Sequence, residues 1–306
     1  MIIASIDIGT NTVLLLVAKV DSQTRKIISL HNEYRMPRIG RGTKQTGIIS
    51  SDRLTLLFDV LSEYDVIIQG FHCDKVILTG TNAFRMAKNT PEIMKKINKL
   101  FNFELNVISG EGEAEYAYYG AISDPDDNSF SMVIDIGGSS TEVIIGEGKR
   151  IISKNSLQLG SVSATEQILK NSPPLKAEIE NLRKEIKILF SSLDYKYIPA
   201  QVIAIAGTAT TLACMKFGLK EFEEVKVDKC IITIQDMKNI IEELSFLTPT
   251  ESLDKYGPVM LGREDIIFAG AFILYQFMEH FGIENIVVST RGIRYGAIVK
   301  YLTNLN

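Results

Sequence analysis

The sequence has few of the residues that usually form metal clusters or disulfide frameworks. Its 306 residues include three cysteines and three histidines. Cys73, Cys214 and Cys230 are far apart and odd in number, so they match neither a zinc-site spacing nor a disulfide framework. We interpret them as reduced thiols. The histidines are scattered along the chain and form no ligand set.

A long uncharged apolar run is also absent, and so is a strong net charge. No stretch approaches the roughly 18 apolar residues of a membrane-spanning helix. The opening MIIASIDIG has no basic n-region and is interrupted by Asp7, which argues against a signal peptide, so we expect a cytoplasmic protein. The net charge of −4 provides no overall attraction to DNA or to an anionic membrane. Any polyanionic ligand must therefore be held by a local site.

What the sequence does contain is an internal repeat. The tetrapeptide Ile-Asp-Ile-Gly occurs at 6–9 and again at 134–137, and each copy ends an apolar run and leads into a hairpin. The third strand of each half also recurs, as KIIS from Lys26 and RIIS from Arg150. A chain of 306 residues exceeds the usual size of a single core. The sequence therefore predicts an α/β protein with two duplicated domains, each a mixed sheet flanked by helices.

The predicted boundary lies in the polar stretch SDPDDNSF, residues 123–130, whose proline and aspartates favour a surface connection. We expect an N-terminal domain over 1–123 and a C-terminal domain over 124–306. The last helix, at about 292–306, is expected to pack back on the first domain.

The repeated turns have the composition of phosphate-binding loops. Asp7 ends a buried strand, where a carboxylate is costly unless it has a partner, and Gly9 allows the backbone to approach a ligand closely. The following Thr10-Asn11-Thr12 offers amides and hydroxyls. Such a loop suits a phosphate on backbone N–H groups and a divalent metal on the carboxylate. The second copy, DIGGSSTE, adds Glu142; an ordinary glycine-containing hairpin is the alternative interpretation of either copy.

A third loop, Ala206-Gly207-Thr208-Ala209-Thr210-Thr211, follows the apolar run VIAIA and precedes a helical stretch. A glycine-threonine loop at a helix start favours an anion, because the first N–H groups of a helix lack intrahelical acceptors. It does not match the Walker A pattern, since the Gly-Lys-Ser/Thr element is missing. A threonine-rich cap without a ligand is the alternative.

Five motifs in this order give the chain a family resemblance. They are TGTNAFRMAKN from Thr79, ISGEGEA from Ile108, DIGGSSTE from Asp135, AGTATTLA from Ala206 and STRGIRYGAI from Ser289. Paired hairpins with a later glycine-threonine loop resemble the actin-like ATPase superfamily. The full set resembles its Ppx/GppA family of exopolyphosphatases and guanosine pentaphosphate phosphohydrolases. The resemblance implies two actin-like (ribonuclease H-like) domains with an interdomain cleft, and Mg²⁺-dependent removal of a terminal phosphate from polyphosphate or pppGpp.

Two departures from the family pattern are visible. The third glycine after Asp-Ile is replaced by Ser139, and the first glutamate of the paired glutamates is Gly112. The second glutamate is retained as Glu113, the position that matches the family's catalytic glutamate. The long C-terminal extension of larger members is not expected here.

The resemblance and the loops together assign candidate roles. Glu113 would be the general base that deprotonates the attacking water, and Arg85 would clamp the scissile phosphoryl group. The metal carboxylates would be Asp7, Asp135 and Glu142. Phosphates would be held by Asn11, Thr12, Gly137, Gly138, Ser139, Ser140, Gly207, Thr208 and Thr210.

Simpler interpretations of three residues remain open. Arg85 could be a solvated charge at a helix start, and Glu113 could simply favour the dipole of an acidic first helical turn. Arg263 could reach the cleft or pair with a neighbouring acidic residue.

The sequence thus favours an exopolyphosphatase with pppGpp as a second substrate. The alternatives are an ATP-dependent small-molecule kinase of the same superfamily and a non-catalytic sensor of (p)ppGpp or polyphosphate. Four basic residues in a glycine-rich loop could form a track for a long chain or a solvated basic loop: Arg35, Arg38, Arg41 and Lys44. No DNA or membrane partner is expected. The oligomeric state stays open, with a homodimer among the options.

Overall fold

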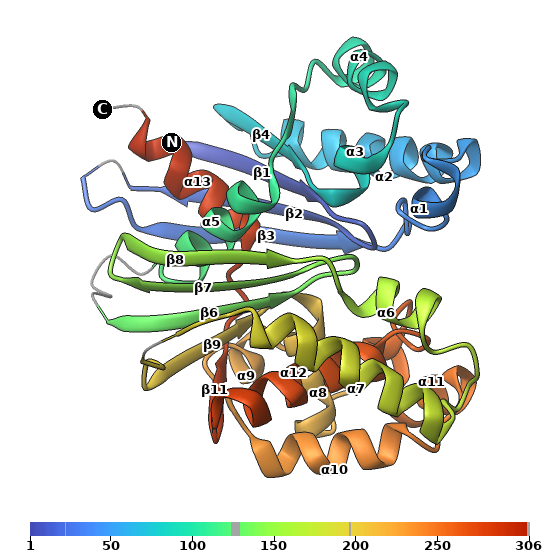
Figure 1. Ribbon diagram of the computed structural model, residues 1–306. Coiled ribbons are helices and arrows are strands. Elements are labelled where there is room, and N and C mark those ends of the chain that lie inside the picture. Colours follow the sequence, from blue (N-terminus) through green and yellow to red (C-terminus); the bar gives the residue numbers. More distant parts are fainter. Residues whose placement is uncertain (22, 124–128, 196, 305–306) are drawn as a thin grey trace. The chain divides into compact units, whose positions relative to one another are not determined.

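The computed structural model describes residues 1–21, 23–123, 129–195 and 197–304. The chain divides into two compact units (Figure 1). Unit 1 comprises Met1–Asn128 and Arg291–Asn306, and unit 2 comprises Ser129–Thr290. The predicted connection at 123–130 lies mostly outside the described residues. The last helix belongs to unit 1, so the second unit ends at Thr290 and not at the end of the chain.

Unit 1 is built on a five-stranded mixed sheet. Its strands are β1 (Ile2–Ile8), β2 (Val13–Val20), β3 (Ile27–Arg35), β4 (Lys75–Gly80) and β5 (Leu105–Val107). The strand order is β3-β2-β1-β4-β5. The first three strands are antiparallel neighbours, whereas β4 and β5 continue the sheet in parallel with β1.

The central strand β1 is apolar throughout because both of its faces are covered. Side chains alternate between the faces of a strand. Ala4 and Ile6 belong to one core cluster, whereas Ile3 belongs to another on the opposite face. A strand buried on both faces is expected to be a continuous apolar run, which is why Asp7 stands out in it.

The described residues of unit 1 also form six helices. They are α1 (Thr43–Thr46), α2 (Ser51–Gly70), α3 (Asn82–Met86), α4 (Thr90–Phe101), α5 (Gly110–Ala121) and α13 (Ile293–Thr303). Residues of α2 and α4 share the core cluster of Ala4 and Ile6. Residues of α13 share the cluster of Ile3, so α2 and α4 cover one face of the sheet and α13 covers the other. From apolar periodicity and caps, the sequence predicts helices at 50–69, from 90 and at 112–122, and α2, α4 and α5 confirm them. It predicts loops where α1 and α3 lie.

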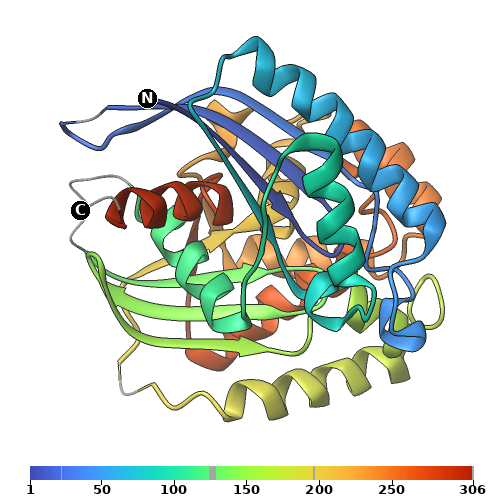
Figure 2. The ribbon, with the colours of Figure 1, turned by 90° about the horizontal axis from the view of Figure 1, so that it is seen from above.

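Helices α5 and α13 pack backbone against backbone, although they come from distant parts of the chain (Figures 1 and 2). A Cβ on Gly120 of α5 would overlap the carbonyl group of Gly292, at the start of α13. A Cβ on Gly296 of α13 would likewise overlap the carbonyl group of Tyr116. Lys300 of α13 also forms an ion pair of 2.6 Å with Glu115 of α5. Gly292 and Gly296, the glycines of the motif STRGIRYGAI, therefore allow α13 to lie directly against the backbone of α5.

Unit 2 repeats the plan of unit 1, as the sequence predicts. Its strands are β6 (Phe130–Ile136), β7 (Thr141–Glu147), β8 (Arg150–Leu157), β9 (Gln201–Ile205), β10 (Ile231–Thr233) and β11 (Asn285–Val288), in the order β10-β11-β9-β6-β7-β8. The antiparallel β6-β7-β8 corresponds to β1-β2-β3, and β9 lies parallel to β6 as β4 does to β1. Even the irregularity of register recurs at the same place, at Val17/Ala18 in β2 and Ile145/Gly146 in β7.

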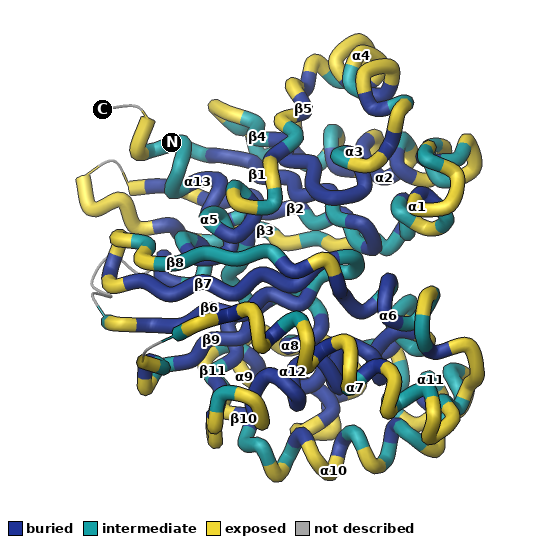
Figure 3. The backbone as a smooth tube through the Cα atoms, in the orientation of Figure 1, coloured by how far each residue is buried: buried dark blue, intermediate teal, exposed yellow. Residues whose placement is uncertain are grey.

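The core of unit 2 is centred on the apolar helix α12, whose residues are almost all buried (Figure 3). The helices of the unit are α6 (Ser161–Gln167), α7 (Lys176–Ser191), α8 (Ala206–Phe217), α9 (Glu224–Val227), α10 (Ile234–Leu244), α11 (Pro249–Tyr256), the 3₁₀ turn η1 (Gly257–Met260) and α12 (Ile267–Phe281). The sequence interpretation assigned no elements between Gly218 and Ile266. Among the described residues, no helix has the length and apolar composition needed to cross a membrane.

Candidate functional site

In unit 1, the turn after β1 holds the first set of predicted residues. Asp7 is 7% exposed and lies directly opposite Thr79 of β4. The turn is closed by a 2.9 Å hydrogen bond from the Gly9 N–H to the Thr12 carbonyl. The Asn11 side chain is buried, and its amide nitrogen donates to no residue that the structure describes. A buried NH₂ group with no protein acceptor is suited to an oxygen-rich ligand.

The basic loop after β3 is attached to this turn through its backbone. The Arg38 N–H donates to the Asn11 carbonyl at 3.1 Å, and the Gly40 N–H donates to the Thr10 carbonyl at 2.9 Å. A Cβ on Gly40 would overlap the Thr10 side chain. Arg35, the first of the four basic residues, pairs with Glu33 at 2.7 Å and with Glu63 at 3.0 Å. Its charge is therefore already neutralised.

The two predicted catalytic residues, Arg85 and Glu113, are brought together. Arg85 lies in the short helix α3, not in a loop, and Glu113 lies in the first turn of α5. The Arg85 Nη1 donates to the Glu113 Oε2 at 2.7 Å and to the Ile108 carbonyl at 2.9 Å. The Arg85 Nη2 donates to the Asn82 Oδ1 at 3.3 Å. A salt-bridged arginine in this setting is not a solvated helix-start charge.

The bonding pattern leaves one edge of the guanidinium available. Nη1 has two acceptors and Nη2 has one, whereas Nε has no partner among the described residues. Nε and Nη2 together form the edge that arginine uses for bidentate contact with phosphate. Arg85 can therefore hold Glu113 with one edge and an anion with the other.

Glu113 is a buried carboxyl group, with a side chain that is 9% exposed. Burial raises the pKa of Glu113 above its ordinary range, and the neighbouring Arg85 partly opposes this shift. A carboxyl group with a raised pKa is a stronger proton acceptor when ionised. This burial separates Glu113 from Glu111 in the same helical turn, which is exposed.

In unit 2, the second hairpin places two carboxylates opposite each other. Asp135 of β6 and Glu142 of β7 are directly paired across the antiparallel strands. They are 4% and 1% exposed. Ser156, opposite Glu142 on β8, donates from its hydroxyl to the Glu142 Oε1 at 2.8 Å. In unit 1 the position corresponding to Glu142 is Leu14, which pairs with Asp7, so only unit 2 carries the carboxylate pair.

The glycine-serine turn between these strands packs against the start of α6. The Gly137 carbonyl accepts the Ser161 N–H at 2.9 Å, and the Gly138 carbonyl accepts the Ser163 N–H at 2.9 Å. A Cβ on Gly160 would come within 2.7 Å of the Ser139 nitrogen and the Gly138 carbonyl carbon. The turn is thus held through the Gly137 and Gly138 carbonyl groups, and the Gly137 N–H donates to the Ser140 carbonyl at 3.0 Å.

The third loop is the first turn of α8 and not a separate loop. Ala206 adopts a positive φ of 66°, an uncommon conformation for a residue with a Cβ. Thr208 donates from its hydroxyl to the Ile136 carbonyl at 3.2 Å, and Thr210 donates to the Ala206 carbonyl at 3.2 Å. The donor hydrogens of both threonine hydroxyls are therefore engaged with the backbone. Any phosphate contact by these residues would depend on their N–H groups and hydroxyl lone pairs.

Arg263 lies against this turn. A Cβ on Gly207 would overlap its guanidinium group, so Gly207 allows the cation to sit directly on the start of α8. The sequence left Arg263 between a site role and a local ion pair, and its contact with Gly207 does not decide between them. This contact, like those of Ser156 with Glu142 and of Gly160 with the Gly137–Ser139 turn, joins segments that are separated in sequence and has no local signal.

The carboxylates present fit a magnesium ion in type and number. Two buried like charges opposite each other, as at Asp135 and Glu142, are costly, and a shared divalent cation would relieve that cost. No three acidic, histidine or cysteine side chains form a metal-binding group among the described residues. Mg²⁺ commonly binds one or two carboxylates together with water and phosphate oxygens, so the donor set suits it.

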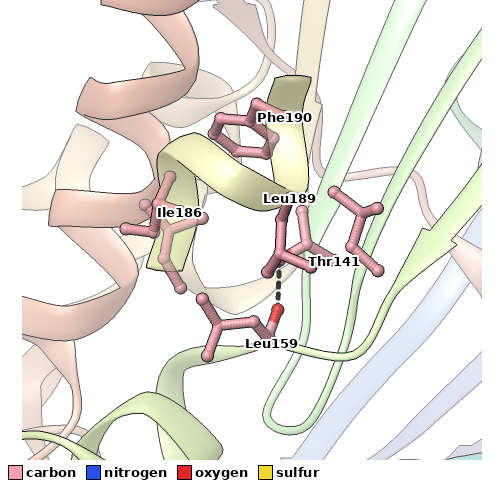
Figure 4. Close-up of a pocket in the computed structure, with 7 residues that line it drawn as sticks. Thr141, Leu159, Ile186, Leu189 and Phe190 are labelled. Atoms are coloured by element: carbon pink, nitrogen blue, oxygen red, sulfur yellow. Dashed lines mark hydrogen bonds between the residues drawn. The ribbon is translucent and has the colours of Figure 1, made fainter. Parts of the chain in front are cut away.

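Unit 2 also contains a small pocket whose lining is almost entirely apolar, unlike the polar residues of the candidate site. It lies between α7, α12 and the β7–β8 hairpin, and its lining includes Leu159, Ile186 and Phe190 (Figure 4). The hydroxyl of Thr141 points to the Leu159 carbonyl and donates to it at 2.7 Å. The pocket has no space for a water-sized molecule. We interpret it as a packing gap of the core.

Comparisons with known proteins agree with the motifs over almost the whole chain. The family model described as the Ppx/GppA phosphatase family matches residues 16–305. Exopolyphosphatase 2 of Mycobacterium tuberculosis is 25% identical over 310 residues, which cover 96% of each chain. Guanosine-5'-triphosphate,3'-diphosphate pyrophosphatase of Vibrio cholerae is 26% identical over 303 residues, covering 99% of this chain and 59% of the relative. The chain spans only 46% of another curated relative, so some relatives are much longer.

A solved structure shares the fold. The crystal structure of the Ppx/GppA family member of Aquifex aeolicus is 28% identical, with a TM-score of 0.86 over 100% of this chain and 99% of that one. The expected arrangement of two mixed sheets flanked by helices is therefore confirmed by the element order and by this likeness.

Proposed function

Because this chain belongs to the Ppx/GppA phosphatase family, we propose that it is a phosphoanhydride hydrolase, a Mg²⁺-dependent exopolyphosphatase that releases the terminal phosphate of inorganic polyphosphate. Hydrolysis of pppGpp to ppGpp would be its second activity. Relatives named for each reaction support both substrates.

The ion pair between Arg85 and Glu113 carries the proposal. Hydrolysis of a phosphoanhydride needs an oriented water and neutralisation of the phosphoryl charge. Glu113 accepts a proton from the attacking water as the water oxygen bonds to the terminal phosphorus. The bridging P–O bond then breaks and the shortened chain leaves. A buried carboxylate with a raised pKa suits the role of base, and Arg85 keeps it ionised and oriented.

Arg85 also links the base to the substrate. Its Nε and Nη2 groups would contact two oxygens of the terminal phosphoryl group, while Nη1 holds Glu113. The distance between base and phosphorus is then set by one rigid, planar group. The buried amide of Asn11 and the N–H side of the Gly137–Ser140 turn would contact further phosphate oxygens. Thr12, Gly207, Thr208 and Thr210 would contribute in the same way.

Asp135 and Glu142 would hold the metal directly, and Asp7, with which they form no three-carboxylate group among the described residues, would contribute through water. When bound, Mg²⁺ supplies positive charge that neutralises phosphate oxygens during the displacement. The residues of the chain orient it, since Ser156 donates to Glu142 and fixes the position of that carboxylate.

The basic loop supports polyphosphate as the preferred substrate. Its backbone is tied to the turn that carries Asn11, so its charges lie near the end of β1. Arg41 and Lys44 are exposed there, as is Lys88, whose N–H donates to the Gly47 carbonyl at 2.8 Å. A row of cations suits a chain with many phosphates better than a single nucleotide.

The decisive experiment measures phosphate release from medium-chain polyphosphate and from pppGpp, with and without Mg²⁺. Glu113→Gln is expected to lower kcat by about 10²–10⁴-fold with substrate binding retained. Glu111→Gln is the matched control, because it removes an exposed carboxylate from the same helical turn. Undiminished release by Glu113→Gln would exclude Glu113 as the base. Binding without release from either substrate would indicate a sensor, and ATP-dependent phosphorylation of a small molecule would indicate a kinase.

A further inference from the structure

Two hydroxyl groups in the sheet of unit 1 are buried without a hydrogen-bond partner among the described residues. They belong to Ser5 of β1, which is fully buried, and Thr79 of β4, which is 1% exposed. Both residues lie in strands that are paired on both sides within the sheet. A buried hydroxyl without a partner is costly. Two of them in adjacent strands point to a shared polar ligand.

The register places these hydroxyls beside Asp7. Thr79 is directly opposite Asp7 in the parallel pair, and Ser5 is two residues before Asp7 on the same strand. Residues at i and i+2 share a face, so Ser5 and Asp7 point to the same side. Ile3, Ile77 and the residues of α13 define that side. Asp7 is therefore the common neighbour of both hydroxyls.

The side chains around this group are apolar and enclosing. Helix α13 packs over this face through Tyr295 and Ile298, which are 2% and 0% exposed. Bulk solvent cannot serve as the partner of the hydroxyls. A small ligand with two or more hydrogen-bonding directions is required, and one water molecule meets this need with about three polar neighbours.

We propose that an ordered internal water binds between Ser5, Thr79 and Asp7, and that the two hydroxyls are positioning residues for the Asp7 carboxylate. The water donates a hydrogen bond to the Asp7 carboxylate. With each hydroxyl it forms one further hydrogen bond, in which either oxygen can be the donor. Outer partners of this kind orient carboxylates that hold a metal. The effect on metal binding rests on the proposed function, because it requires Asp7 to take part in Mg²⁺ binding. The water site itself does not.

A double-mutant cycle on the full-length chain tests the water. Thr79→Val and Ser5→Ala each remove one hydroxyl, and each is expected to lower the Tm by about 2–4 °C because the water loses a partner. The decrease in Tm of the double variant is expected to be smaller than the sum of the decreases of the two single variants, because both hydroxyls bind the same water molecule. A rise in Tm for Thr79→Val would show an unsolvated hydroxyl and overturn the proposal. Additive losses would overturn a shared water.

A high-resolution crystal structure provides the direct observation. Density for a water within hydrogen-bond distance of Ser5 Oγ and Thr79 Oγ1 is expected in the wild type and not in the double variant. Direct bonds between the hydroxyls and protein groups would overturn the proposal. Calorimetric titration with Mg²⁺ then tests the positioning role, with an expected loss of affinity of about tenfold in Thr79→Val. If the wild type binds no Mg²⁺, the proposed function fails while the water site still stands on the Tm cycle and the density.

Discussion

Arg85 and Glu113 are joined by a 2.7 Å ion pair, although 28 residues separate them in the sequence. The same guanidinium group also takes the Ile108 carbonyl and the Asn82 amide oxygen as acceptors. These bonds connect the ends of β4 and β5 to the start of α5. The guanidinium group of Arg85 thus fixes the position of Glu113 relative to the sheet. The hydrogen-bonding geometry of this group can be tested separately from its charge.

Arg85→Lys is expected to lower kcat by about tenfold or more while the fold is retained. Lysine keeps the positive charge but cannot hold Glu113 and a phosphate with two parallel N–H groups. Steady-state kinetics with polyphosphate measure the effect, and circular dichroism checks the fold. Lys96→Arg, a charge-conserving exchange on the distant helix α4, is the control and should leave kcat within about twofold. Equal activity of Arg85→Lys would show that only the charge matters.

The pH dependence should reveal the raised pKa of Glu113. The base must be ionised, so kcat/KM is expected to fall as the pH drops through a value above the ordinary carboxylate range. This acidic limb should be absent from the residual activity of Glu113→Gln. Stability must change in the opposite sense: because burial raises the folded-state pKa, ionising Glu113 costs stability as the pH rises through that pKa. We therefore expect the Tm of Glu113→Gln, relative to the Tm of the wild type, to rise from acidic to neutral pH. If the difference between the two Tm values is the same at every pH, the pKa of Glu113 is not raised.

The sequence was sufficient for the repeated core of the fold. Apolar runs that end in Asp-Ile-Gly identify β1 and β6, and the apolar runs that follow the two turns identify β2 and β7. The sequence interpretation missed α10 and α11, although both begin at a threonine whose side chain accepts from the N–H three residues later, Asp236 in α10 and Glu251 in α11. These two capping boxes are local signals that were available in the sequence.

Candidate site residues were predictable where their motif is local, as in the two hairpin turns. The partners of those residues were not. Nothing near Gly207 in the sequence indicates that Arg263 lies on it, and nothing near Ser5 indicates Thr79. Such relationships depend on strand register and helix packing, which a single sequence with no alignment does not contain.

Gly296→Ala should destabilise unit 1 by about 1–3 kcal/mol, the usual cost of overpacking. The new methyl group would overlap the Tyr116 carbonyl group, which belongs to a helix backbone and cannot rotate away. Movement of α5 should also reduce activity through Glu113. Chemical denaturation measures the first effect and polyphosphate kinetics the second. Gly70→Ala is the control: it is also helical, it faces open space, and it should be neutral or slightly stabilising. Equal stability of the two variants would refute the close packing of α5 and α13.

Gly207→Ala should leave stability nearly unchanged and lower activity. Its methyl group would displace only the end of the Arg263 side chain, which is flexible. Arg263→Ala is expected to have a similar effect on kcat/KM. The double variant should be little worse than either single one, because both act through the same guanidinium group. Fully additive losses would show that Gly207 and Arg263 contribute independently.

Arg41→Gln should weaken the use of long polyphosphate more than the use of short chains. Arg41 is exposed and has no ion pair with any residue that the structure describes, so its charge is available to a polyanion. Loss of one exposed interaction of about 0.5–1 kcal/mol corresponds to a two- to fivefold rise in KM. The difference should shrink as salt is added, because exposed charges are screened. Arg35→Gln removes the same formal charge from a residue already paired with Glu33 and Glu63, so its KM should stay closer to that of the wild type. Equal effects of the two substitutions at every chain length would mean that net charge, and not a track along the loop, attracts the substrate.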